Sequence, residues 1–290
     1  NTLNITGEEL YNNWKNELNE IYFKQLKSLN SNNSFTIIES EGTTNIHPVW
    51  SPNEQKFAFL SNKENDYFGQ TSLYIYSFKD SLSIKIKGGV KSAPTWIDDN
   101  QIIYSKRSKP NKNGSKFFDL YKYNIKEEEE ERLTNDLRLF SPVFDNNNRK
   151  IYAINTYDGS CNILMGNEDF SDYKQVTNFN NGLQIFSLAQ KDSLLLFDVV
   201  ENHERSIYYY NLYSDEIGQY KSEKWDVRDP SYINDIEVNS NDKLGVFNLY
   251  LNNELTSGYL TNVAGGAFMP HISENGEILF SLYQNGGYKI

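Results

Sequence analysis

The chain has 290 residues, of which 38% are apolar and 23% charged, and its formal net charge at pH 7 is −11. No apolar run approaches the roughly 18 residues that a membrane-spanning helix needs, so we expect no direct membrane insertion. The negative charge repels phosphate backbones, and we therefore expect no nucleic-acid partner.

The single cysteine excludes an intrachain disulfide and leaves the redox compartment open. The chain starts at Asn1 rather than at a methionine, which indicates a processed chain or a part of a longer protein.

The first 34 residues predict a helix followed by a polar linker. Thr6 and Glu9 have the spacing of a capping box, in which hydroxyl and carboxylate accept from free backbone N–H groups. Apolar residues then recur at helical spacing, at Leu10, Trp14, Leu18, Ile21, Tyr22 and Leu26. The amphipathic helix either packs on the rest of the chain, ends a preceding domain or binds a partner. Residues 28–34 read SLNSNNS, which predicts the linker.

From residue 47 a unit built on a proline and a nearby aromatic residue repeats along the chain. It first reads HPVWSPNEQKFAFLS (47–61) and returns as APTWIDDNQIIYS (93–105), SPVFDNNNRKIYAI (141–154), DPSYINDIEV (229–238) and MPHISENGEILFSL (269–282). A sixth copy, FSLAQKDSLLLFDVV (186–200), has a serine in place of the proline. The anchors are 40 to 48 residues apart, at Pro48, Pro94, Pro142, Ser187, Pro230 and Pro270. A period in the forties with several short strands per unit is typical of propeller blades.

A second marker, a Thr-Asn pair, recurs in the same register at Thr134, Thr177 and Thr261. Between the markers lie further alternating segments such as SLYIYSF (72–78) and SIYYYNL (206–212), so each unit predicts four strands. The sixth unit ends after its third strand, and FTIIE at 35–39 can supply the missing one beside 287–290. The prediction is an all-β, six-bladed propeller over 35–290, closed by an N-terminal strand and preceded by the helix and linker of 1–34.

The proline has a physical reason to be at this position. It lacks an N–H donor, so it belongs where the strand has no ladder partner, such as the start of an innermost strand at the crowded axis. The aromatic residue two positions later points to the same face and can fill the space between blades. These residues are Trp50, Trp96, Phe144 and Tyr232.

The units resemble those of the TolB-like (WD40-like) propellers, whose repeat runs roughly aPxWSPDGkxIaFxS, then an aromatic strand, then Leu-Thr. HPVWSPNEQKFAFLS is the best match, and the resemblance covers about 35–290. The full SPDG turn never occurs, and the fourth unit lacks the proline. The resemblance implies a propeller that is generally non-catalytic, often periplasmic, and binds partner proteins on one face of the disc. Similar repeats also occur beside a metallopeptidase-like domain in larger envelope proteins.

Three histidines occur, at 47, 203 and 271, and Ile207 breaks the H-E-x-x-H zinc pattern that His203 would start. His47 and His271 flank the anchors of the first and sixth units, which adjoin in a closed ring. They are either ordinary polar residues of the channel mouth or, alternatively, a shared metal site or proton switch. We expect no metal, no cofactor and no catalytic residue in this chain.

A carbohydrate-active propeller, a glycosidase or lyase with an axial active site, is the alternative from the enzyme class. It needs at least two carboxylates that converge on the axis. Only one of the residues that precede the anchors is acidic; they are His47, Ala93, Ser141, Phe186, Asp229 and Met269. Asp229 also follows Arg228, with which it can pair.

The sequence therefore predicts a non-catalytic module that binds a protein or peptide partner in the bacterial cell envelope. The resemblance alone implies the periplasm. We expect a monomer that belongs to a larger multidomain protein. The candidate binding residues lie at the channel mouth: His47, Arg228, Asp229 and His271.

Overall fold

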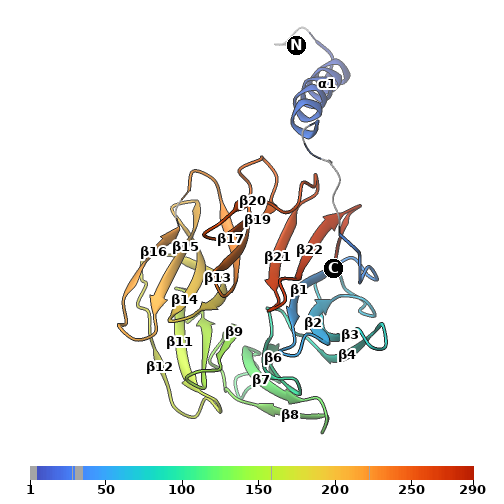
Figure 1. The fold of residues 1–290 in the computed structure, drawn as a ribbon. Coiled ribbons are helices and arrows are strands. Elements are labelled where there is room, and N and C mark those ends of the chain that lie inside the picture. The colour runs from blue at the N-terminus through green and yellow to red at the C-terminus, as the bar shows by residue number, and fades with distance from the viewer. Residues whose placement is uncertain (1–4, 28, 30–34, 158, 222) are drawn as a thin grey trace.

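The six repeated units fold into six antiparallel sheets arranged around one axis, as the ribbon shows (Figure 1). The computed structural model describes residues 5–27, 29, 35–157, 159–221 and 223–290. The predicted linker of 28–34 lies outside the described residues, apart from Leu29. The predicted six-bladed, all-β propeller is confirmed. The division of the chain after residue 34 stays a prediction.

In every blade the strands follow the chain from the axis outward. The first three blades comprise β1 (Asn45–Trp50), β2 (Lys56–Ser61), β3 (Ser72–Ser77) and β4 (Leu82–Gly88); β5 (Thr95–Asp98), β6 (Gln101–Arg107), β7 (Phe118–Asn124) and β8 (Glu129–Arg132); and β9 (Leu139–Asp145), β10 (Lys150–Asn155), β11 (Asn162–Asn167) and β12 (Tyr173–Gln175). The other three comprise β13 (Gln184–Lys191), β14 (Leu194–Glu201), β15 (Glu204–Asn211) and β16 (Ile217–Lys221); β17 (Val227–Ile233), β18 (Ile236–Asn241), β19 (Asn248–Asn252) and β20 (Ser257–Tyr259); and β21 (Ala267–Ile272), β22 (Ile278–Gln284) and β23 (Gly287–Lys289).

The core lies between adjacent blades. Trp96 of the second blade packs in a cluster with Leu60 and Leu73 of the first, and its indole N–H donates to the carbonyl of Val49 (3.1 Å). Trp50 of the first blade packs with Leu279 of the sixth. The predicted placement of these two tryptophans between blades is confirmed. Each blade thus buries its apolar faces only when both neighbours are present, and the ring stabilises itself as a whole.

The Thr-Asn marker has a structural role that recurs in three blades. The buried Thr177 hydroxyl accepts from the N–H of Ile163 (2.8 Å) and donates to the side chain of Asn162 (3.0 Å). Thr134 makes the same two bonds with Leu120 and Asp119. Thr261 makes them with Leu249 and Asn248. The threonine therefore fixes the end of each outer strand to the third strand of its own blade.

The N-terminal helix α1 (Gly7–Leu26) begins with the predicted capping box. The N–H of Glu9 donates to Thr6 Oγ1 (3.1 Å), and the N–H of Thr6 donates to Glu9 Oε2 (2.8 Å). The helix buries none of its residues and projects away from the ring (Figure 1). It therefore does not pack lengthwise on the propeller. Among the described residues, no helix is both long enough and apolar enough to cross a membrane.

The ring closes where residues 38–39 meet the C-terminus, as the sequence predicted. The N–H groups of Ile38 and Glu39 donate to the carbonyl of Ile290 (2.6 and 2.9 Å), whose own N–H donates to Glu39 (3.0 Å). The N–H of Tyr288 donates to the carbonyl of Thr43 (2.9 Å). Residues 35–39 are too irregular for a full strand, so the sixth sheet has three strands in the described part of the chain.

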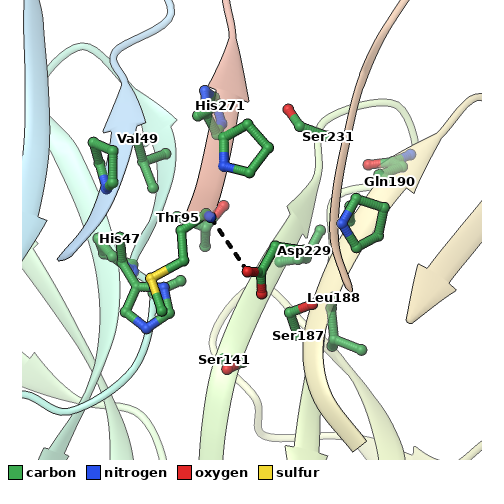
Figure 2. A pocket seen from close by; sticks show the side chains of 18 of the residues that line it. His47, Val49, Thr95, Ser141, Ser187, Leu188, Gln190, Asp229, Ser231 and His271 are labelled. Carbon is green, nitrogen blue, oxygen red and sulfur yellow. Dashed lines mark hydrogen bonds between the residues drawn. The ribbon is translucent and has the colours of Figure 1, made fainter. Parts of the chain in front are cut away.

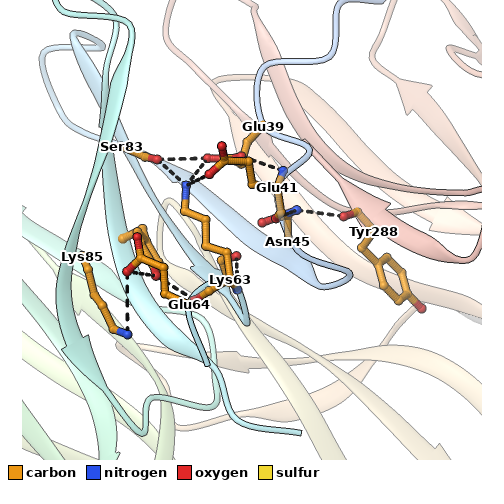
Figure 3. Close-up of polar contacts among 10 residues, drawn as sticks. Glu39, Glu41, Asn45, Lys63, Glu64, Ser83, Lys85 and Tyr288 are labelled. Carbon is orange, nitrogen blue, oxygen red and sulfur yellow. Dashed lines mark hydrogen bonds and ion pairs between the residues drawn. The ribbon is translucent and has the colours of Figure 1, made fainter. Parts of the chain in front are cut away.

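A buried ion pair joins this closing segment to the first blade (Figure 3). Lys63 Nζ lies 2.6 Å from Glu39 Oε2 and 2.5 Å from the hydroxyl of Ser83, and both charged side chains are 8% exposed. The ammonium also lies 4.8 Å from the ring centroid of Tyr74. Lys63 is the cation that pairs with Glu39, so removal of Lys63 would leave the Glu39 carboxylate buried and uncompensated.

Deletion of residues 1–40 should open the ring. It removes the backbone bonds to Ile290, the partner of Lys63 and the packing of Phe35 and Ile38. We expect the melting temperature to fall by about 10 °C or more. The deletion removes several kcal/mol of folding free energy, and each kcal/mol lowers the melting temperature by about 2–4 °C in a domain of this size. Deletion of residues 1–26, which removes α1 alone, is the control and should melt within a few degrees of the parent. Equal melting of the two truncations would contradict the closure.

The ion pair can be tested separately by a double-mutant cycle. Lys63→Met should destabilise the protein by about 3–5 kcal/mol, because it leaves the Glu39 carboxylate buried without its cation. The double variant Glu39→Leu/Lys63→Met should recover most of that loss, as both charges are gone. Urea unfolding of the wild type, both single variants and the double variant measures the coupling. A double variant less stable than Lys63→Met would show that the pair does not act as a unit.

Candidate functional site at the propeller axis

The inner strands of all six blades surround a cavity of about 250 Å³ on the axis. Its lining includes every repeated anchor: Pro48, Pro94, Pro142, Ser187, Pro230 and Pro270. The predicted position of the proline on the innermost strand is confirmed, but its position at the start of that strand is wrong. In four blades it is the fourth residue of the strand, at a bulge where the ladder shifts register and the proline needs no partner: Pro48, Pro142, Pro230 and Pro270. Because proline has no N–H, the crowded axis contains fewer backbone donors that would need partners.

The residue before the proline is turned toward the cavity by a backbone bulge. His47, Ser141, Asp229 and Met269 have positive φ angles of 54°, 48°, 51° and 54°, and the ladders shift register there. All four line the cavity, and Figure 2 shows His47, Ser141 and Asp229 around it. L-residues seldom adopt this conformation, so its recurrence in four blades belongs to the architecture. The bulge decides which side chain faces the axis.

Asp229 is buried, and one of its two carboxylate oxygens has two partners. Its Oδ2 accepts from Arg228 Nε (2.9 Å) and from the N–H of Met269 in the next blade (3.2 Å; Figure 2). The pairing of Asp229 with Arg228 that the sequence suggested is therefore present. Arg228 does not line the cavity, and its guanidinium lies over the rings of Phe247 and Phe268 (5.6 and 5.5 Å to the centroids).

The two predicted histidines both line the cavity and are neutral at pH 7. Burial lowers the pKa of His271 from 6.5 to about 4, and its Nδ1 accepts from the N–H of Trp50 in the first blade (3.3 Å). Burial also lowers the pKa of His47 to about 4, against the opposing charge of Asp229, while Arg228 adds to the lowering. The structure thus brings three of the four predicted residues to the cavity, with Arg228 behind them.

Sequence reasoning missed Asp198, which is fully buried on β14. Its Oδ1 accepts from the N–H of Ser187 (2.9 Å), and its Oδ2 from the N–H of Asp229 (3.2 Å) and from Arg205 Nη2 (2.7 Å). Ser187 is the anchor that is not a proline, so it has an N–H that needs an acceptor. The missing proline was therefore a signal that an acidic or amide side chain lay opposite on the neighbouring strand.

The described residues offer little for metal or acid–base chemistry. No group of three or more His, Cys, Asp or Glu side chains among them has the arrangement of a metal site. Asp229 is the one carboxylate among the described residues that line the axial cavity. Glycoside hydrolysis of the usual kind needs a pair of carboxyl groups, so the arrangement suits hydrogen bonding and apolar contact with a ligand better than that reaction.

Fold and cavity together define a six-bladed β-propeller with a small, partly apolar axial channel. No protein-family model matches the chain. Over 117 residues it is 29% identical to the Tol-Pal system protein TolB of Ruthia magnifica subsp. Calyptogena magnifica. The aligned region covers 40% of this chain and 26% of that protein. The predicted resemblance to TolB-like propellers is thereby confirmed.

Solved structures of other proteins share the fold. TolB from Acinetobacter baumannii superposes with a TM-score of 0.58 and 13% identity over 85% of this chain and 56% of that one. An oligogalacturonate lyase in complex with manganese superposes with a TM-score of 0.59 and 13% identity over 87% of this chain and 77% of that one. The chain thus spans about a quarter of the curated TolB and just over half of the TolB structure.

Acid should destabilise the protein through the two axial histidines. With a pKa of about 4 folded against 6.5 unfolded, each takes up a proton only on unfolding between these values, so stability falls as the pH drops from 7 to 4. His47→Gln and His271→Gln should each reduce that loss, on the order of 2–3 kcal/mol per histidine, in urea unfolding at pH 7 and pH 4.

The matched control for both substitutions is His203→Gln, on the exposed turn between β14 and β15. It should keep the pH dependence of the wild type. If His271→Gln lost as much stability between pH 7 and pH 4 as the wild type, the imidazole would not be neutral in the folded protein.

Proposed function

We propose that this chain is a non-enzymatic interaction module of the bacterial cell envelope, which binds a segment of a partner protein at the mouth of the axial channel. The observation that carries the proposal is the state of Asp229. The carboxylate is buried, and its Oδ2 is already engaged by Arg228 and by the N–H of Met269, so these contacts compete with a role as an acid or a base. A channel whose polar groups are neutral or paired is suited to recognition.

The similarity to TolB supports the setting of this proposal. The relative is named as a protein of the Tol-Pal system, which makes an assembly with other proteins and a periplasmic location the expectation for this chain. We further propose that residues 1–34 form a unit separate from the propeller of 35–290, since α1 buries none of its residues. The propeller is proposed to act as a monomer.

Within this proposal the ligand meets His47, Arg228, Asp229 and His271. Three of these residues line the channel, and Arg228 pairs with Asp229 from behind it. Loops from all six blades converge there on a rigid ring, which is where propeller surfaces combine side chains from distant parts of the sequence.

The alternative is a carbohydrate-active propeller, and the similarity to an oligogalacturonate lyase is the observation that favours it. This reading needs further acidic or basic groups at the axis, because Asp229 is the one carboxylate among the described lining residues. The two readings differ in a measurable way, since a module retains a partner and a lyase releases unsaturated products.

The test combines retention and turnover. The tagged chain is incubated with bacterial envelope extract, and the retained proteins are compared with those on a variant carrying alanine at His47, Arg228, Asp229 and His271. We expect a stoichiometric partner on the wild type that the variant loses, and no turnover of polygalacturonate, other polysaccharides or peptides. Thermal melting checks that the variant is folded.

Two results would overturn parts of this proposal. A partner that bound the four-alanine variant as well as the wild type would move the site away from the channel mouth. Robust turnover that disappeared with Asp229→Asn, with no retained partner, would replace the module with the enzyme.

A further inference from the structure

A second cavity, of about 410 Å³, opens beside the axial channel and shares His47 and Ser141 with it. It lies where the loop after β4, the loop before β7 and the start of β9 come together. Its volume is within the range of about 300–1,000 Å³ that is usual for ligand pockets. None of the sequence motifs pointed to it.

The charge of this cavity is opposite to that of the whole protein. Lys91, Lys116 and Arg138 line it, and no Asp or Glu does so among the described residues. The chain as a whole has 39 acidic and 28 basic residues. None of the three cations has a carboxylate within 4 Å in the part of the chain that the structure describes. Their charge is therefore available to a ligand.

Arg138 is the residue that most clearly lacks a partner. Its Nε is buried, and no acceptor lies within hydrogen-bond distance of it among the described residues. A buried donor without an acceptor is rare in folded proteins and unfavourable. Arg205 also has a buried Nε without an acceptor, but its Nη2 pairs with Asp198, and Arg228 pairs with Asp229. Arg138 has neither kind of contact with a carboxylate among the described residues. The acceptor that Arg138 lacks can be supplied by a ligand.

Aromatic rings fix the guanidinium of Arg138 in place. Its carbon lies 4.4 Å from the ring centroid of Phe117 and 5.4 Å from that of Tyr157. The rings can interact with the guanidinium through its charge, while its N–H donors have the geometry that matches the two oxygens of a carboxylate. Phe117, Phe118, Phe140 and Phe186 add an apolar wall to the same cavity. The cavity thus offers a carboxylate partner and an apolar surface side by side.

We propose that this cavity, named here the Arg138 pocket and lined by Lys91, Lys116, Arg138 and the four phenylalanines, binds a short acidic peptide segment of the partner protein, with an Asp or Glu beside an apolar side chain. The carboxylate meets Arg138 with the two lysines at the rim, and the apolar side chain packs on the phenylalanines. The inference rests on the proposed function, because it takes the ligand to be part of a protein.

A peptide fits these charges better than a polyanion does. A nucleic acid or a polyuronate carries a negative charge on every unit and would extend beyond three cations onto a surface with net charge −11. A segment with one or two carboxylates meets only the local positive charge.

The test begins with a random heptapeptide phage library panned against the full chain. We expect enrichment of peptides in which an Asp or Glu adjoins Phe, Leu, Ile or Trp. The most enriched peptide is then synthesised in two forms, one with its carboxylates and one with the corresponding amides. Calorimetry should show at least about tenfold weaker binding for the amide form, as a charge-assisted bidentate contact is lost.

Substitutions then place the peptide in the Arg138 pocket. Arg138→Gln should weaken binding at least about tenfold, and Arg138→Lys should restore it only in part, since lysine cannot make the planar paired contact. Lys91→Gln/Lys116→Gln changes two exposed side chains, so it tests the pocket even if Arg138→Gln fails to fold. Lys112→Gln, exposed in the same loop as Lys116 but outside the cavity, is the matched control and should change affinity less than twofold.

The outcomes separate this inference from the proposed function. Enriched peptides without acidic residues would overturn the Arg138 pocket and leave the proposed interaction module intact. The same holds if Arg138→Gln and Lys91→Gln/Lys116→Gln leave peptide binding unchanged while the four-alanine channel variant abolishes it. No enriched peptide, together with binding of trigalacturonate that Arg138→Gln removes, would overturn the peptide and favour the carbohydrate ligand.

Discussion

The pairing of residues 38–39 with the C-terminal residue Ile290 is the interaction on which the rest of the structure depends. Ile38 and Glu39 bond to Ile290 through the backbone, and Glu39 binds Lys63 in a buried ion pair. Each blade buries its apolar surface against two neighbours, so an open ring would expose a face of the first blade and a face of the sixth. The axial cavity exists only because all six inner strands are held around one point.

The same closure sets the chemistry of the axis. His271 of the sixth blade accepts from the N–H of Trp50 in the first, which requires a neutral imidazole. Around the rest of the ring, Asp198 binds the N–H of Asp229, and Asp229 binds that of Met269 in the next blade. Polar side chains that look like candidate catalytic groups in the sequence are thus used to join blade to blade. Since these polar groups serve to connect the blades, the arrangement favours a surface that binds a partner at the mouth of the channel.

Beside the axis, the Arg138 pocket departs from that pattern. Arg205 and Arg228 each lie over an aromatic ring and pair with an aspartate. Arg138 also lies over an aromatic ring, but no acid pairs with it among the described residues. A protein of net charge −11 that leaves three cations unpaired around one apolar cavity has a local preference opposite to its average. Specificity for a partner can arise from such a local difference more readily than from total charge.

The sequence by itself determined the blades, their order and the closure. Repeats of proline, aromatic residue and turn encode local strand and hairpin geometry, and a period in the forties counts the units without knowledge of their contacts. The tertiary structure decided what the sequence could not. Lys91, Lys116 and Arg138 lie in three separate loops, and Asp198 meets Asp229 from another blade. How far apart these residues lie, how deeply they are buried and whether they have a partner depend on how the six blades are arranged around the axis. Electrostatic and packing energies are determined by neighbours in space and not by spacing in the sequence.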